Sequence, residues 1–146
     1  SHKWSAYFRL KIMVLKTIET KKSVTEFVNS ISDESKKKDT KAIISLIKKI
    51  TGKQPKLWGT IIGFGKYKYN RKNSKEELEW FNIGVAPRKA NISIYLTCYL
   101  ENEPLIKKLG KIKSGKGCLY INKLDDIDLN IFKKLIIKYK NHKWYS

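Results

Sequence analysis

The sequence predicts an α+β fold: a mostly antiparallel, curved sheet with helices packed on one face. Amphipathic helical patterns flank the chain, and short apolar runs separated by polar turns fill its middle. The regular strand–helix alternation of a parallel sheet is missing. The expected order of elements is α-α-β-β-β-α-β-α. We assign residues 23–140 to a single domain, with tails at 1–22 and 141–146, and interpret Ser1 and His2 as vector-derived.

Two helices are expected in the first third of the chain. Ser23 and Glu26 have the spacing of a capping box, which predicts a short helix within residues 21–31. The segment 32–34 offers the cap of a second helix, with acidic residues in its first turn. Gly52 ends that helix, because glycine favours the position just past a helix end.

The middle of the chain is predicted to form strands separated by polar turns. They span residues 57–64, 66–69, 80–85 and 91–100. The first contains a bend that its glycines permit. In the last, alternate residues face opposite sides of the sheet: Ile92, Ile94 and Leu96 on one side, and Ser93, Tyr95 and Thr97 on the other.

The last third of the chain adds a helix, a strand and another helix. Pro104 suits the first turn of a helix. Residues 114–117 read as a turn, and residues 118–121 as a short strand. Asp128 is the expected N-cap of a final helix that runs to about Tyr139.

Basic residues strongly outnumber acidic ones. The chain has 32 Lys and Arg against 13 Asp and Glu, a formal net charge of +19. Only Arg9, Arg71 and Arg88 are arginine, so the planar forks that clamp phosphates and read bases are scarce. Two interpretations stay open: a lysine-rich solvated surface, or attraction to polyanions or membrane surfaces. No run approaches the ~20 apolar residues of a membrane span.

We expect no enzymatic activity, because the residues of a catalytic centre are not found together. The histidines are His2 and His142, both near the chain ends. Cys98 and Cys118 lie within apolar runs, which favours buried free thiols. Two cysteines without a secretory signal predict a reducing, cytoplasmic location.

If a polyanion is bound, two basic stretches are the candidates. The stretch 66–72 alternates lysine with tyrosine, which suits base stacking but equally a hairpin with solvated lysines. The turn 114–117 with its flanking lysines could form an anion nest, or only allow positive φ. The candidate residues are Lys66, Lys68, Arg71, Lys111, Lys113 and Lys116.

Two further candidate sites involve acidic and aromatic residues. Asp125, Asp126 and Asp128 offer hard oxygen ligands for iron or magnesium, although Asp128 also suits helix capping. Aromatic side chains are expected to line a concave sheet face that binds a ligand or forms a homodimer interface. The predicted ligand face consists of Trp58, Phe64, Tyr67 and Trp80.

Several motifs together resemble a known family. The most specific are LGK at 109–111, GKGCLYI at 115–121 and KLDDID at 123–128, preceded by IGFGKY at 62–67 and ISIYL at 92–96. On these motifs the chain resembles the YdhG-like domain-of-unknown-function family (number 1801) over about residues 23–140.

The resemblance implies a curved antiparallel sheet packed against helices. It also implies a frataxin-like iron-chaperone role, which depends on exposed acidic surfaces. Here only the acidic groups at 125–128 and 76–79 could carry that role. The sequence thus predicts a small non-enzymatic binding domain, for which the resemblance implies iron as the ligand. The alternative is a lysine-rich module that binds nucleic acid or another polyanion.

Overall fold

The computed structural model describes residues 19–20, 22–70 and 73–143 and confirms the α+β class. Its α-helices are α2 (Val24–Asn29), α3 (Glu34–Thr51) and α4 (Leu129–Tyr139). Its strands are β1 (Glu19–Thr20), β2 (Lys56–Trp58), β3 (Ile61–Phe64), β4 (Tyr67–Asn70), β5 (Glu77–Trp80), β6 (Ile83–Pro87), β7 (Ile92–Leu96), β8 (Lys113–Ser114) and β9 (Cys118–Ile121). Short 3-10 helices span Leu100–Asn102, Pro104–Lys108 and Leu124–Asp126. No described helix is both long enough and apolar enough to cross a membrane.

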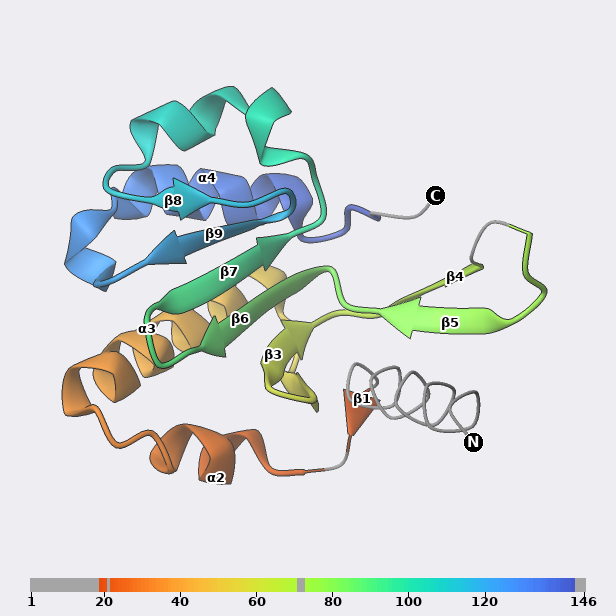
Figure 1. Cartoon of the computed structure of the whole chain (residues 1–146), viewed down its shortest axis with the longest axis horizontal. Coiled ribbons are helices and arrows are strands. Elements are labelled where there is room, and N and C mark those ends of the chain that lie inside the picture. The colour runs from red at the N-terminus through yellow and green to blue at the C-terminus, as the bar shows by residue number, and fades with distance from the viewer. Residues whose placement is uncertain (1–18, 21, 71–72, 144–146) are drawn as a thin grey trace, which may run out of the picture.

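Seven strands form one antiparallel sheet in the order β1-β2-β3-β6-β7-β9-β8. Among the described strands, β4 and β5 pair only with each other, and they project from one side of the molecule (Figure 1). Helices α3 and α4 pack against each other and lie behind the main sheet in that view. The helices therefore cover one sheet face, as the sequence predicted.

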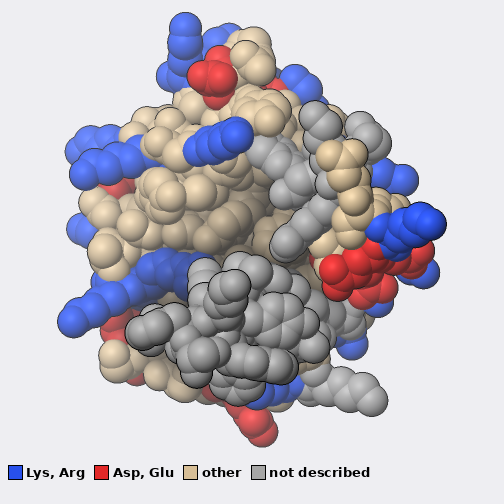
Figure 2. All heavy atoms as spheres, turned by 45° about the vertical axis from the view of Figure 1, so that its right-hand side comes forward, with Lys and Arg blue, Asp and Glu red and all other residues tan. Residues whose placement is uncertain are grey.

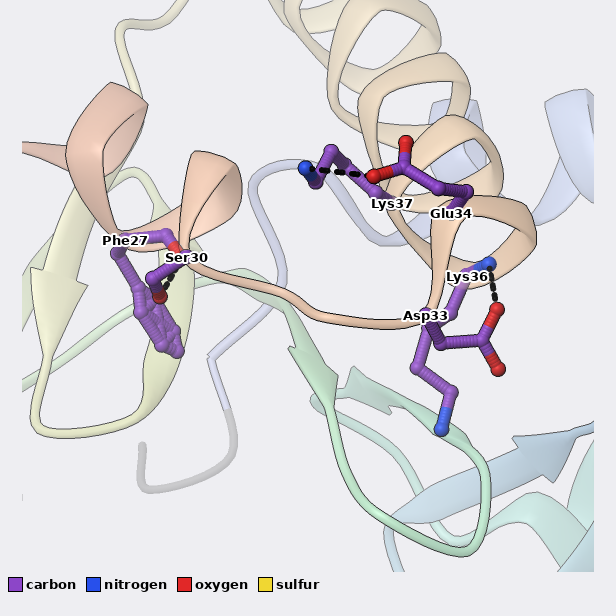
Figure 3. Close-up of polar contacts among 6 residues, drawn as sticks. All are labelled: Phe27, Ser30, Asp33, Glu34, Lys36 and Lys37. Carbon is purple, nitrogen blue, oxygen red and sulfur yellow. Dashed lines mark hydrogen bonds and ion pairs between the residues drawn. The ribbon is translucent and has the colours of Figure 1, made fainter.

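Side-chain caps begin the first two helices where the sequence places them. The hydroxyl of Ser23 accepts a hydrogen bond from the Glu26 amide at 3.2 Å. A carboxylate oxygen of Asp33 accepts one from the Lys36 amide at 3.1 Å, as Figure 3 shows. These bonds satisfy amides that have no partner inside the helix. Helix α3 ends at Gly52, which adopts φ 68° as a left-handed C-cap.

The main core lies between the sheet and the helices α3 and α4. A row of apolar residues crosses five strands in register, and each is at most 3% exposed: Leu57, Ile62, Val85, Ile94 and Leu119. They form one cluster with the buried side chains of the two helices, among them Ile43, Ile47, Phe132 and Leu135. Burying this apolar surface is the main stabilising term of the fold.

A second, smaller cluster lies on the other side of the sheet. Here Trp58 and Phe81, both almost fully buried, rest on the glycine pair Gly63 and Gly84, which face each other in adjacent strands. A Cβ on Gly63 would lie 2.6 Å from a Trp58 ring carbon, and one on Gly84 2.5 Å from a Phe81 ring carbon. Only glycine therefore lets the two rings approach the backbone this closely.

The structure corrects two of the predicted strands. Residues 57–64 form the hairpin β2–β3 instead of one bent strand, because a two-residue turn separates Trp58 from Ile61. Residues 80–85 are divided between β5 and β6 at Phe81 and Asn82. At this break the buried side chain of Asn82 lies against Gly65. A Cβ on Gly65 would lie 2.0 Å from Asn82 Oδ1, so only glycine fits there.

Three smaller expectations change as well. The helix expected at Pro104 is a 3-10 helix, in which the amides of Ile106 and Leu109 bond to carbonyls three residues earlier. Strand β8 occupies the start of the predicted 114–117 turn, and β1 lies inside the predicted N-terminal tail. Residues 1–18 and 144–146 of the predicted tails lie outside the described residues.

The described part of the C-terminal tail is bound to the sheet. The His142 carbonyl accepts hydrogen bonds from Asn82 Nδ2 at 2.9 Å and Thr97 Oγ1 at 3.0 Å. The Lys53 ammonium donates to the Lys140 carbonyl at 3.0 Å. Partial burial and repulsion from the Lys140 charge lower the pKa of Lys53. This junction joins the end of α4 to the strands.

We expect Gly84→Ala to lower the free energy of unfolding by about 1–3 kcal/mol, because the new methyl group overpacks Phe81 and Ile61. Urea unfolding measures the loss, and near-ultraviolet circular dichroism should show a changed aromatic environment. Gly52→Ala is the control: its Cβ meets nothing within 4 Å, so only backbone strain is added. An unchanged aromatic spectrum in Gly84→Ala would contradict the close packing.

Candidate binding face of the sheet

One side of the main sheet has no described α-helix packed on it, and we call this side the open face. Strand register determines which residues share it. Gly63, Gly84, Tyr95 and Cys118 lie in one row across β3, β6, β7 and β9. Ser93, Tyr120 and Lys113 lie in the neighbouring row. The open face therefore carries aromatic and polar side chains where the other face carries aliphatic ones.

Aromatic rings pack edge to face and in stacks at the centre of the open face. Trp80 stacks on Phe81 with ring centroids 4.3 Å apart, and Trp58 meets Phe81 edge-on at 5.7 Å. Tyr95 approaches Phe81 from the other side at 6.0 Å. Phe81 and Trp58 are buried, whereas Trp80 and Tyr95 stay partly exposed. The buried rings thus support the exposed ones.

A shallow slot of about 160 Å³ lies between the exposed rings. It is lined mainly by Trp80, Phe81, Tyr95, Thr97 and Cys118. Drug-sized ligands usually occupy roughly 300–1,000 Å³. The slot therefore has room for a single planar ring, and its walls are the flat faces and edges on which such a ring stacks.

The Tyr95 ring is held in place by the only described arginine. One guanidinium nitrogen of Arg88 donates to the Tyr95 hydroxyl at 3.0 Å, and the other donates to Thr60 Oγ1 at 2.6 Å. This bridge spans the β2–β3 turn and strand β7. It fixes the ring orientation and brings a permanent positive charge to the open face.

Cys118 and Tyr120 form a second polar pair on the open face. The Cys118 thiol donates to the Tyr120 hydroxyl oxygen, with sulfur and oxygen 3.0 Å apart. This contact is the main reason that the pKa of Tyr120 is raised. Cys98, in contrast, is buried in the main core, and burial raises the pKa of its thiol. The expectation of a buried thiol is confirmed for Cys98, while Cys118 is only partly buried.

The predicted polyanion residues lie in two separate places. Lys66 and Lys68 are on or beside the β4–β5 hairpin and form ion pairs with Glu79 and Glu77, at 3.9 and 2.9 Å. Arg71 lies outside the described residues. On the opposite edge of the sheet, the exposed residues Lys111, Lys113 and Lys116 lie in or beside β8.

Both kinds of charge lie around the open face. Figure 2 shows a hollow of mostly uncharged atoms, with Lys and Arg side chains on parts of its described rim and Asp and Glu side chains on another part. Lys113 continues the row of Tyr120 at the sheet edge, and Arg88 lies beside Tyr95. An anion that reaches the aromatic slot would therefore meet cations on its way.

The structure places the four residues of the predicted ligand face at different depths and on different sides of the sheet. Trp80 lines the slot, and Trp58 lies below it as a buried support. Tyr67 is only 6% exposed and pairs with Trp80 at the base of the hairpin. Phe64 was wrongly assigned, because it belongs to the main core on the helix side of the sheet.

The three predicted metal ligands do not form a cluster. Among the described residues, no group of three or more His, Cys, Asp or Glu side chains could hold a metal ion. Asp128 caps α4 by accepting from the amides of Asn130 at 2.9 Å and Ile131 at 3.2 Å. Asp125 and Asp126 belong to a 3-10 helix, and the Asp126 carbonyl accepts from the Lys111 amide.

Sequence reasoning missed Phe81, Arg88, Tyr95 and Tyr120 as residues of the candidate site. The alternation in residues 92–97 did place Tyr95 opposite the isoleucines, which was a usable signal. Arg88 stood in a predicted turn, and its contact with Thr60 depends on a hairpin that the sequence did not indicate.

Comparisons with known proteins give no further assignment: no family model, no curated protein and no solved structure matches this chain. Membership of the YdhG-like family therefore stays a prediction from the sequence motifs.

A buried carboxylate lies away from the open face. Glu103 is 3% exposed and accepts from the Tyr139 hydroxyl at 2.6 Å, the Lys138 ammonium at 2.5 Å and the Leu105 amide at 2.9 Å. Burial alone would raise its pKa, but these hydrogen bonds outweigh burial and hold the pKa of Glu103 below its ordinary value. Burial and the bond to Glu103 raise the pKa of Tyr139. The contacts of Glu103 with Lys138 and Tyr139 join α4 to residues 103–105, so the cluster has a structural role.

We expect Glu103→Gln to lower the free energy of unfolding at neutral pH by about 1–3 kcal/mol, since charge-assisted hydrogen bonds are lost. A carboxyl whose folded pKa is depressed contributes stability above its unfolded pKa, which is about 4.3. That contribution disappears as pH falls through the folded pKa, so the two proteins should converge in acid. Urea unfolding across pH measures this, with the exposed Glu101→Gln as control. A difference that persists in acid would contradict the assignment.

Proposed function

We propose that this chain is a non-enzymatic binding domain that holds single-stranded nucleic acid on the open face of its sheet. The aromatic slot between Trp80 and Tyr95, within a chain of net charge +19, carries the proposal. Every nucleobase has a planar face that can stack on such rings, and lysines attract the phosphate backbone. The sequence left this function open as its alternative.

The geometry favours a single strand over other ligands. The slot has room for one planar ring and too little room for a whole drug-sized molecule. Bases in a duplex are stacked on each other and cannot enter it, whereas the bases of a single strand are free to do so. The partly exposed Tyr120 offers a further ring on the neighbouring strand.

The charges are placed to follow a backbone across the sheet. Arg88 lies at one side of Tyr95, and Lys113 lies beyond Tyr120 at the other edge. A nucleic-acid strand that crosses the sheet from β6 toward β8 would pass the slot, then Tyr120, and then the lysines at 111–116. The scarcity of arginine implies little base-specific hydrogen bonding, so we expect weak sequence preference.

We expect Trp80→Ala and Tyr95→Ala each to weaken binding of fluorescently labelled oligothymidine by about 1–3 kcal/mol, because each removes one stacking surface. Fluorescence anisotropy measures the affinity, and circular dichroism checks that each variant is folded. Ile137→Ala is the control, since Ile137 is 55% exposed on α4, on the helix side of the sheet, and does not line the slot. Affinity that is unchanged in both slot variants would reject the open face as the site.

The salt dependence should be steep. For a single strand the slope of log affinity against log salt concentration is about −0.7 per phosphate neutralised. A flat response, or no binding at about 0.15 M salt, would contradict the proposal.

A further inference from the structure

A second cavity lies on the helix side of the molecule, between α2, α3 and the β1–β2 edge of the sheet. Its volume is about 750 Å³, within the usual size range of small-molecule sites. Helix α3 contributes one stripe at spacings of three and four residues: Lys41, Ile44, Ser45 and Lys48. Helix α2 contributes Val24, Thr25, Val28 and Asn29, and the segment 54–56 also lines the cavity. We call this cavity the basic cleft.

The charges of the basic cleft are all of one sign. Four exposed lysines line it, Lys22, Lys41, Lys48 and Lys56, and no described Asp or Glu does. Within the described part of the chain, none of the four forms an ion pair. Like charges that converge on one cavity repel each other, and a bound anion removes this repulsion.

The remaining lining divides into an apolar floor and polar groups. Val28 is buried, and Ile44 and Pro55 are partly buried, so these side chains form an apolar base. Thr20 also lines the cleft, and its hydroxyl oxygen is buried without a hydrogen-bond partner among the described residues. The buried hydroxyl oxygen is not in contact with the open space of the cleft, so Thr20 contributes to its wall.

We propose that the basic cleft binds a phosphorylated organic anion of nucleotide size. Several phosphate groups would lie among the four ammonium groups, and the organic part would rest on Val28, Ile44 and Pro55. Lysine acts as a point charge toward phosphate and needs no fixed fork geometry, which suits a cleft without arginine. The polar side chains of Thr25, Ser45 and Gln54 can bond to the remaining ligand oxygens.

This site is independent of the proposed function. It is built from α2, α3 and the β1–β2 edge, and it shares no lining residue with the aromatic slot. Because a nucleobase can also stack in the aromatic slot, binding at the basic cleft is identified by variants that change the cleft and leave the slot unchanged.

Calorimetric titration of the full chain with ATP, without magnesium and at about 0.15 M salt, tests the proposal. We expect saturable binding at one site, weakened on the order of tenfold in the double variant Lys41→Ala, Lys48→Ala because two charge-assisted contacts are lost. The matched control is Lys133→Ala, Lys134→Ala, which removes the same charge from exposed positions of α4 that line no described cavity. The control should bind within twofold of the original protein.

A titration with inorganic triphosphate tests how much of the affinity comes from the phosphate groups and how much from the organic part of ATP. We expect it to bind more weakly than ATP, and Ile44→Ser to weaken ATP but not triphosphate. Equal loss of ATP binding in the two double-lysine variants would mean that overall charge alone attracts the ligand, which overturns the site. Absence of saturation in the original protein overturns it too, and equal affinity for ATP and triphosphate overturns the assignment of an organic ligand.

Discussion

The arrangement of the open face depends on a pair of glycines. Gly63 and Gly84 face each other in β3 and β6, and there the backbone is bare enough for two large rings to lie on it. Without that space Trp58 and Phe81 would be lifted from the sheet, and Trp80 would lose the ring on which it stacks. Two absent side chains thus determine the positions of at least three aromatic ones.

The sheet separates two kinds of chemistry. Its helix side is filled by aliphatic side chains and depends on the hydrophobic effect. Its open side is an aromatic layer only partly closed to solvent, with Arg88 and the pair Cys118–Tyr120 among the rings. Alternation along each strand produces both sides from the same segments, so a change of register by one residue would exchange them.

The sequence predicts the helix caps correctly, because they are interactions between neighbouring residues. It does not predict contacts between residues that are far apart in the chain. The caps at Ser23, Asp33 and Asp128 involve residues two or three positions apart, so a single sequence contains the whole interaction. The hairpin at 57–64 shows the opposite case. A two-residue turn shifts the alternation by one, which moves Phe64 to the helix side although an unbroken strand would place it beside Trp58.

The candidate sites were harder to predict for the same reason. The aromatic slot joins residues of β5, β7 and β9, and the basic cleft joins two helices to a sheet edge. Nothing in the spacing of the lysines along the sequence indicates that Lys22 and Lys56 line the same cavity as Lys41 and Lys48. Packing brings these groups together, and packing depends on the whole core.

The β4–β5 hairpin has a consequence for how the chain can vary. Within the described part of the chain its strands form ladders only with each other, and Tyr67 and Trp80 anchor it at its base. Lengthening or shortening the hairpin beyond that base leaves the register of the main sheet unchanged, because no described strand of that sheet pairs with β4 or β5. The end of the β4–β5 hairpin is therefore the natural place for inserting a tag or a reporter, or for joining this domain to another one.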